Sequence, residues 1–208
     1  MQMRWRRTLG DSEWLRLNHI YEDSFPPEER VSLSALREGV GAGKRSLLTA
    51  ETTTDLLGFA TVFGLPALAT AYLEFLAVAP DERNAGLGGS MLDFMVLSLR
   101  DRGTRAIIFE VESDTQPGAS DICMRRRRIG FYQRHGASLV GCAPAYRAPD
   151  LTGGGSTPMR LMWLPISPLA PQPSGELLRG CIAAMYTGSY ARPPDDPLLR
   201  SVLAELVC

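Results

Sequence analysis

The sequence lacks the signals of several common site types. Its four cysteines form no C-x-x-C pair, and it contains only two histidines. This pattern argues against a zinc knuckle and a thioredoxin-type centre, and we expect no metal site. The even number of cysteines leaves two disulfides open. Because residues 8–13 are polar where a secretory signal would be apolar, we expect free thiols in a cytoplasmic protein.

A hydrophobic run long enough to cross a membrane is also missing. Uncharged residues extend from 58 to 73, but a transmembrane helix needs roughly 20 apolar residues, and Pro66 interrupts the run. Two buried strands that meet at residues 64–66 explain the stretch better. We therefore expect no contact with a membrane.

Neither sign of charge dominates the chain. Its 22 Lys and Arg residues are balanced by 23 Asp and Glu residues, and the net charge is −1. A dedicated nucleic-acid-binding domain would be strongly basic, so this balance argues against that class. With 45% hydrophobic and 22% charged residues over 208 positions, the composition is that of a folded globular protein, and disorder of the whole chain is excluded.

Hydrophobic periodicity predicts a mixed α/β fold built on one sheet. Prolines 165, 168, 171 and 173 predict a linker, so we expect one domain over residues 1–165 and a C-terminal helical extension over residues 166–208. The expected helices cover residues 12–24, 32–39, 86–100, 125–134, 175–186 and 197–207. The expected strands cover residues 1–8, 45–51, 56–63, 72–78, 106–112, 137–142 and 159–164.

One segment has the pattern of a phosphate-binding turn. A predicted buried strand over residues 72–78 leads into a glycine-rich turn and then directly into a helix. Glycine allows close approach of a ligand, and the first N–H groups of a helix carry partial positive charge without a partner in the helix. The pattern therefore favours a pyrophosphate site over a glycine-rich helix start without a ligand. A Walker A loop does not fit, because Glu38 stands where that motif requires glycine. A dinucleotide fingerprint does not fit either, because Met91 stands where that motif requires glycine or alanine.

Two motifs in this order resemble the GNAT acyltransferase superfamily. Residues 83–88, RNAGLG, fit its R/Q-x-x-G-x-G/A signature, and residues 131–137, FYQRHGA, are similar to its second motif. The resemblance covers residues 1–165. It implies an α/β fold with a single twisted, mixed sheet whose central strands splay apart between flanking helices. It also implies an N-acyltransferase that moves an acyl group, foremost acetyl, from a coenzyme A thioester to a primary amine of a small molecule.

The resemblance also implies the donor side of the site. The donor, acetyl-CoA or another acyl-CoA, would lie along Leu76, Ala77 and Val78, and the amine would attack it directly in a ternary complex. Tyr132 stands where the family places a general acid that protonates the leaving thiolate, and the alternative for Tyr132 is a core aromatic. The pyrophosphate would bind the turn made of Arg83, Asn84, Ala85, Gly86, Leu87, Gly88, Gly89 and Ser90.

Carboxylates are candidates for the acceptor side. Glu74 is the only charged residue of an apolar strand, so we expect it to act as catalytic base or acceptor anchor unless it forms a structural salt bridge. Alternation places Glu110 and Glu112 on one face of another strand, where they would bind the acceptor. In the family the loop with Glu28 and Glu29 walls the acceptor pocket. The two residues would meet a cationic acceptor there, or form a solvated turn.

Four consecutive arginines depart from the family pattern: Arg125, Arg126, Arg127 and Arg128. Cations near a predicted helix N-terminus are disfavoured by the helix dipole, so an anion should compensate them. Asp114, Asp121, a substrate and the adenosine phosphates of coenzyme A are the candidates. The alternative, which we favour, is a solvated charged face without such a role.

The residues leave other functions and partners open. The arginine run would also suit an aminoacyl-tRNA or a carrier-protein thioester as acyl donor, and a non-catalytic acyl-CoA-binding module is a third alternative. A homodimer contact through the face with Trp14, Leu17 and Phe25, or through the C-terminal extension, is open as well.

Overall fold

The computed structural model describes residues 1–116 and 121–207 and divides the chain into two compact units. Unit 1 comprises Met1–Gly64, Leu73–Arg102 and Leu151–Gly153, and unit 2 comprises Leu65–Tyr72, Gly103–Asp150 and Gly154–Cys208. One sheet has the strand order β1-β2-β3-β4-β5-β8-β6, with β7 paired to β8 alone. The neighbours β4 and β5 are joined through a helix, which is the crossover that parallel strands require. The fold is therefore a single mixed sheet with flanking helices, as expected.

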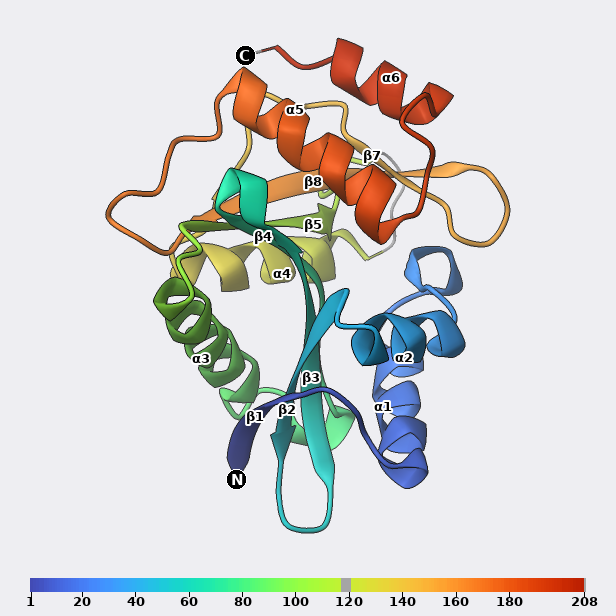
Figure 1. Cartoon of the computed structure of the whole chain (residues 1–208), viewed down its shortest axis with the longest axis vertical. Coiled ribbons are helices and arrows are strands. Elements are labelled where there is room, and N and C mark those ends of the chain that lie inside the picture. The colour runs from blue at the N-terminus through green and yellow to red at the C-terminus, as the bar shows by residue number, and fades with distance from the viewer. Residues whose placement is uncertain (117–120, 208) are drawn as a thin grey trace. The chain divides into compact units, whose positions relative to one another are not determined.

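Unit 1 is built on antiparallel strands. β1 (Gln2–Arg6) pairs with β2 (Arg45–Glu51), and β2 pairs with β3 (Leu56–Leu65) across a four-residue turn. β4 (Thr70–Val78) follows β3 in the sheet. Figure 1 shows the course of the chain through these strands and through the helices α1 (Asp11–Ser24), α2 (Leu33–Gly41) and α3 (Leu87–Asp101).

The first two helices bury their apolar faces in the core of unit 1. Trp14, Leu17, Ile20 and Tyr21 recur at helical spacing along α1 and are buried. They form one hydrophobic cluster with residues of α2 and of strands β2, β3 and β4. Trp14 and Leu17 are 2% and 0% exposed, so these two side chains belong to the core of unit 1, and a homodimer contact stays an open possibility.

Unit 2 is built around β8 (Ser156–Pro165). β8 pairs antiparallel with β5 (Ala106–Glu112), β6 (Ser138–Leu139) and β7 (Arg147–Pro149). Helices α4 (Ile122–Arg134), α5 (Gly175–Ala184) and α6 (Pro197–Ala204) complete the unit, and a π-helical turn (Met185–Ser189) follows α5. Within unit 2, α4 and α5 lie on opposite sides of the β5–β8 pair (Figure 1). The two faces of β5 therefore meet different helices.

Several elements differ from the sequence expectation. α1 begins at Asp11 and is capped at Gly10, whose N–H donates to the Glu13 carboxylate at 2.6 Å. β7 was not expected, and β6 has two residues where a strand over 137–142 was expected. At the end of the expected strand, the carbonyl of Cys142 accepts a hydrogen bond from the N–H of Val207 at 3.0 Å. This carbonyl therefore has its hydrogen-bond partner outside the sheet.

The start of α4 changes the interpretation of the arginine run. α4 begins at Ile122, three residues earlier than expected, so the arginines start at its fourth residue. The dipole acts mainly within the first turn, and the expected conflict between the run and the helix N-terminus is therefore wrong.

The structure also bears on membrane-spanning helices, metal sites and disulfides. Within residues 1–116 and 121–207, no helix is long and apolar enough to cross a membrane, and no group of His, Cys, Asp or Glu side chains is arranged to hold a metal ion. Cys123, Cys142 and Cys181 are free thiols. Cys208 lies outside the described residues.

Candidate active site

The turn between β4 and α3 has the backbone that its glycines predict. Gly86 is the N-cap of α3 and lies in the left-handed region with φ +83°, a conformation that glycine adopts without strain. A Cβ built on Gly86 would meet no atom within 4 Å, so the space beside it is open. No side-chain hydrogen bond caps this end of α3. Because the first N–H groups of a helix lack partners within it, this turn fits a diphosphate group.

Arg83 connects this turn to the end of α1 through hydrogen bonds and an ion pair. Its guanidinium donates hydrogen bonds to the Ser24 hydroxyl at 3.1 Å and to the Val78 carbonyl at 3.2 Å, and it forms an ion pair with Asp23. These contacts join the end of β4 to the end of α1. Arg83 therefore positions the turn whose backbone amides would bind the phosphates.

Gly58 on β3 sets the close approach between strand and helix beneath the turn. A Cβ at Gly58 would lie 2.8 Å from the Ala77 carbonyl oxygen and 2.9 Å from Met91 Sδ on α3. A larger residue would push these groups apart. Because Gly58 has no side chain, the end of β4, with Ala77 and Val78, can lie close to α3.

Glu74 on β4 is the ion-pair partner of Arg45 on β2. Arg45 Nε lies 3.0 Å from both carboxylate oxygens of Glu74. The side chains are 9% and 2% exposed, respectively. Gly39 of α2 makes room for the guanidinium, because a Cβ at Gly39 would lie 2.6 Å from Arg45 Nη1. Of the two roles left open by the sequence, these contacts support the structural salt bridge.

Glu28 and Glu29 lie in the 3-10 turn Pro27–Glu29 of unit 1, and both are half-buried. The carbonyl of Glu28 accepts a hydrogen bond from the N–H of Leu151 at 2.9 Å, which anchors the turn. The neighbouring Arg30 pairs with Glu22 at 3.2 Å. The acceptor-binding role of Glu28 and Glu29 stays a prediction.

Tyr132 is packed against β5 in unit 2. Its ring centroid lies 4.4 Å from that of Phe109, and its side chain is buried. Burial raises the pKa of Tyr132 to about 12, and the nearby Arg128 acts in the opposite direction. The hydroxyl therefore remains protonated over the physiological pH range.

Glu110 accepts hydrogen bonds from three tyrosine hydroxyls of unit 2. Tyr72 and Tyr190 each donate to Oε2 at 2.5 Å, and Tyr146 donates to Oε1. Burial, followed by the charge of Glu110, raises the pKa of each of these tyrosines well above its ordinary value. Because side chains alternate along a strand, Glu110 lies on the face of β5 opposite Phe109 and Tyr132.

Glu112 and the arginine run share a network of ion pairs in unit 2. Arg128 pairs with Glu112, and Arg126 lies 3.9 Å from Asp114. Arg125 pairs with Asp121 at 2.9 Å, and its hydrogen bond lowers the pKa of that carboxyl. Asp114 and Asp121, two of the anions expected to compensate the run, do so, together with Glu112.

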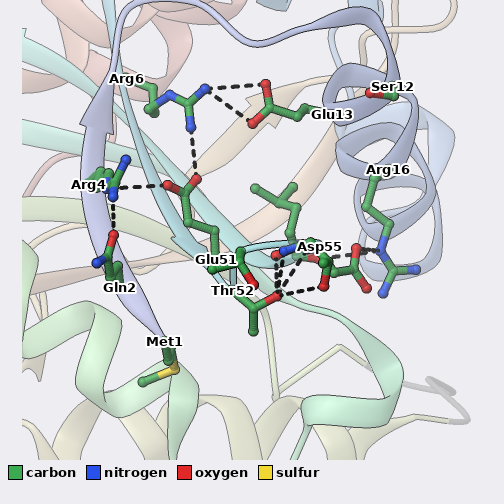
Figure 2. A pocket seen from close by; sticks show the side chains of 13 residues that line it. Met1, Gln2, Arg4, Arg6, Ser12, Glu13, Arg16, Glu51, Thr52 and Asp55 are labelled. Carbon is green, nitrogen blue, oxygen red and sulfur yellow. Dashed lines mark hydrogen bonds and ion pairs between the residues drawn. The ribbon is translucent and has the colours of Figure 1, made fainter.

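A separate polar cavity of about 600 Å³ lies in unit 1 between β1, the start of α1 and the β2–β3 turn. Figure 2 shows that its charges are paired: Arg6 joins Glu13 and Glu51, and Arg16 joins Asp55. None of the site residues expected from the sequence lines this cavity. Because its opposite charges neutralise each other, we assign it no part in the reaction.

The fold and the turn at Gly86 define a class. A mixed sheet in which a strand leads through a left-handed glycine into an uncapped helix is typical of α/β proteins that bind the phosphates of a cofactor. Residues 14–137, more than half of the chain, match the model of the Acetyltransferase (GNAT) family. The chain therefore belongs to the GNAT acetyltransferase family, whose members use acetyl-CoA, and it is an N-acyltransferase.

Solved structures agree with this assignment. A protein from Bacteroides thetaiotaomicron assigned to the GNAT acetyltransferases is 26% identical, with a TM-score of 0.73, over 93% of this chain and 100% of its own. The ribosomal-protein-S18-alanine N-acetyltransferase of Escherichia coli is 22% identical, with a TM-score of 0.56, over 80% of this chain and 95% of its own. An aminoglycoside 6'-N-acetyltransferase complexed with coenzyme A is 17% identical, with a TM-score of 0.61, over 84% of this chain and 100% of its own. The last two show the fold alone. No curated protein matches the sequence.

Sequence reasoning missed the partners of the acidic candidates. Arg45, Tyr72, Tyr146 and Tyr190 were not singled out, although they contact Glu74 and Glu110. Each of these contacts joins residues that are 29 or more positions apart in the chain, so no local pattern in the sequence could have shown it.

Proposed function

We propose that this enzyme transfers the acetyl group of acetyl-CoA to the primary amine of a small cationic molecule, by direct attack in a ternary complex. The observation that supports binding of the donor is the open turn at Gly86. A Cβ at Gly86 would meet nothing within 4 Å, and no side chain caps the N-terminus of α3 next to it. Leu76, Ala77 and Val78 of β4 would lie along the pantetheine arm. The turn from Arg83 to Ser90 would hold the pyrophosphate.

The chemistry balances without a covalent enzyme intermediate. The amine nitrogen attacks the thioester carbonyl, a C–N bond forms, and the C–S bond breaks. An acceptor that arrives as ammonium loses two protons, the departing thiolate takes up one, and one proton is released to solvent. A backbone N–H of β4 would stabilise the oxyanion that develops during attack.

Tyr132 would act on the leaving sulfur. A thiol has a pKa of about 8.5, and the pKa of Tyr132 is raised to about 12, so complete transfer of the tyrosine proton to the thiolate is uphill. We therefore assign Tyr132 the role of a hydrogen-bond donor to the developing thiolate. The proton that the thiol keeps would come from the amine.

Glu110 is the carboxylate that we assign to the acceptor. Glu74 and Glu112 form ion pairs with Arg45 and Arg128, and Glu110 accepts hydrogen bonds from the phenol hydroxyls of Tyr72, Tyr146 and Tyr190. Glu110 is half-buried, so its surroundings keep some access to solvent. A half-buried carboxylate that is oriented by phenol hydroxyls would attract a cationic acceptor.

The contacts of the arginine run favour a coenzyme A thioester over a macromolecular donor. A tRNA or a carrier protein would need cations that face solvent without protein partners. Arg125, Arg126 and Arg128 have carboxylate partners in unit 2 that offset part of this charge, although the side chains of Arg126 and Arg128 are 65% and 41% exposed.

Native mass spectrometry and a transfer assay test this function. Protein purified without added ligand should carry the mass of coenzyme A, and not that of RNA. With acetyl-CoA, it should release free thiol only when hexylamine, 1,6-diaminohexane or a tripeptide with a free N-terminus is present, and the amine should gain an acetyl group. Absence of coenzyme A binding in a calorimetric titration would refute the proposal.

A further inference from the structure

The tyrosines around Glu110 come from three separate parts of unit 2. Tyr72 lies on β4, Tyr146 precedes β7, and Tyr190 follows the π-helical turn after α5. The hydroxyls of Tyr72 and Tyr190 lie 3.2 Å apart and share the same carboxylate oxygen. Tyr190 belongs to residues 166–208, which we expected to form an extension outside the catalytic domain.

The cluster has a buried side and an open side. Tyr72 and Tyr146 are 3% and 2% exposed, whereas Glu110 and Tyr190 are half-buried. The ring of Tyr190 packs against Tyr186, with centroids 5.8 Å apart, and against Tyr72, with centroids 6.4 Å apart. A molecule that reaches Glu110 from solvent would therefore have Tyr190 beside it, on the same open side of the cluster.

Three O–H donors on one carboxylate have a defined electrostatic effect. Hydrogen bonds donated to a carboxylate favour its charged form, and each donor fixes the orientation of the group. The tyrosines themselves stay neutral, so they orient the negative charge without cancelling it. Tyrosine rings around such a charge also suit an ammonium group, which interacts favourably with aromatic faces.

We propose that Tyr190 is a positioning and specificity-determining residue for acetyl transfer, and that the C-terminal segment, residues 166–207, contributes to the acceptor site through this one residue. Tyr190, with Tyr72 and Tyr146, holds the Glu110 carboxylate ready for the ammonium group of the acceptor. This inference rests on the proposed function, because it presumes that an amine binds at Glu110.

A pair of matched variants isolates the hydroxyl of Tyr190. Tyr190→Phe removes one O–H donor to Glu110 and keeps the ring. Tyr186→Phe is the control, because Tyr186 lies in the same segment but donates its O–H to the Arg147 carbonyl. Initial rates are measured with acetyl-CoA and hexylamine, each varied in turn. Thermal melting confirms that both variants fold.

The expected result is a change confined to the acceptor. In Tyr190→Phe, kcat/KM for hexylamine should fall about tenfold, the factor for one hydrogen bond to a charged group, while the KM for acetyl-CoA stays unchanged. Tyr186→Phe should leave both values unchanged. Tyr72→Phe on β4 should repeat the loss, and it keeps the test valid if Tyr190→Phe does not fold.

Other outcomes separate this inference from the proposed function. If Tyr190→Phe and Tyr72→Phe match Tyr186→Phe while the wild type acetylates hexylamine, the inference is wrong and the function stands. If the wild type binds coenzyme A but acetylates no amine, the amine acceptor and this inference both fail. If the wild type does not bind coenzyme A, the proposed function itself fails.

Discussion

Arg45 Nε lies 3.0 Å from each carboxylate oxygen of Glu74, in a pair that is almost completely buried. The two residues come from β2 and β4, which are separated by β3 in the sheet. A charge in an apolar strand needs a partner of opposite sign, and the guanidinium supplies it. This contact explains how a charge is accommodated in an apolar strand.

Breaking the pair should destabilise the protein more than it affects the chemistry. Arg45→Leu and Glu74→Leu should each lower the free energy of unfolding by about 3–5 kcal/mol, because each leaves a buried charge without its partner. The double variant should lose less than the sum of the two. Urea denaturation measures all three. A Glu74→Leu variant of native stability but without turnover would instead make Glu74 the catalytic base.

Charge placed at Gly86 should weaken coenzyme A binding. Gly86→Glu brings bulk and negative charge to the turn, and the dissociation constant for coenzyme A should rise about tenfold or more, which corresponds to about 1.4 kcal/mol. Gly103→Glu is the matched control, because Gly103 also has a left-handed φ of +87° and open space within 4 Å. Calorimetry should show unchanged binding in the control, and equal losses in both variants would contradict the site.

Tyr132→Phe should lower turnover without changing donor binding. The variant loses the hydrogen bond to the developing thiolate, and kcat should fall by a factor on the order of 10–100, while KM for acetyl-CoA is kept. Tyr21→Phe is the control, since Tyr21 is another buried tyrosine and its hydroxyl donates to the Val31 carbonyl. Steady-state kinetics measure kcat and the KM for acetyl-CoA in both variants. If Tyr132→Phe keeps the kcat of the wild type, Tyr132 has no part in the mechanism.

The protein should lose stability in strongly alkaline solution. Burial raises the pKa of Tyr132 to about 12, so above pH ~10 the unfolded chain releases a proton that the native state keeps. The stabilisation is complete below the unfolded pKa and declines by up to about 1.4 kcal/mol per pH unit as the pH rises towards the folded pKa. The pKa values of Tyr72, Tyr146 and Tyr190 shift in the same direction.

Urea midpoints between pH 9 and 11.5 measure this effect. Tyr132→Phe should reduce the slope of stability against pH, because one titrating group is removed. An unchanged slope in this variant would contradict the raised pKa.

Much of the fold could be predicted because it depends on local patterns. The expected strands at residues 45–51 and 106–112 match β2 and β5 to the residue, and the expected helix over residues 86–100 matches α3 within one residue. The start of α4 could not be predicted well, because Ile122, Cys123 and Met124 show no clear helical period on their own. The cap of α1 was missed because Gly10 has no side chain that marks it.

By itself, the sequence determined the turn that would bind the donor. Residues 83–90 form a left-handed glycine followed by a helix N-terminus, and both depend on interactions within about four residues of the chain. Only the tertiary structure decided what the carboxylates do. Arg45 reaches Glu74 across 29 residues, and Tyr190 reaches Glu110 across 80 residues. A buried charge takes its role from the groups that packing brings to it, and packing joins residues that no local spacing relates.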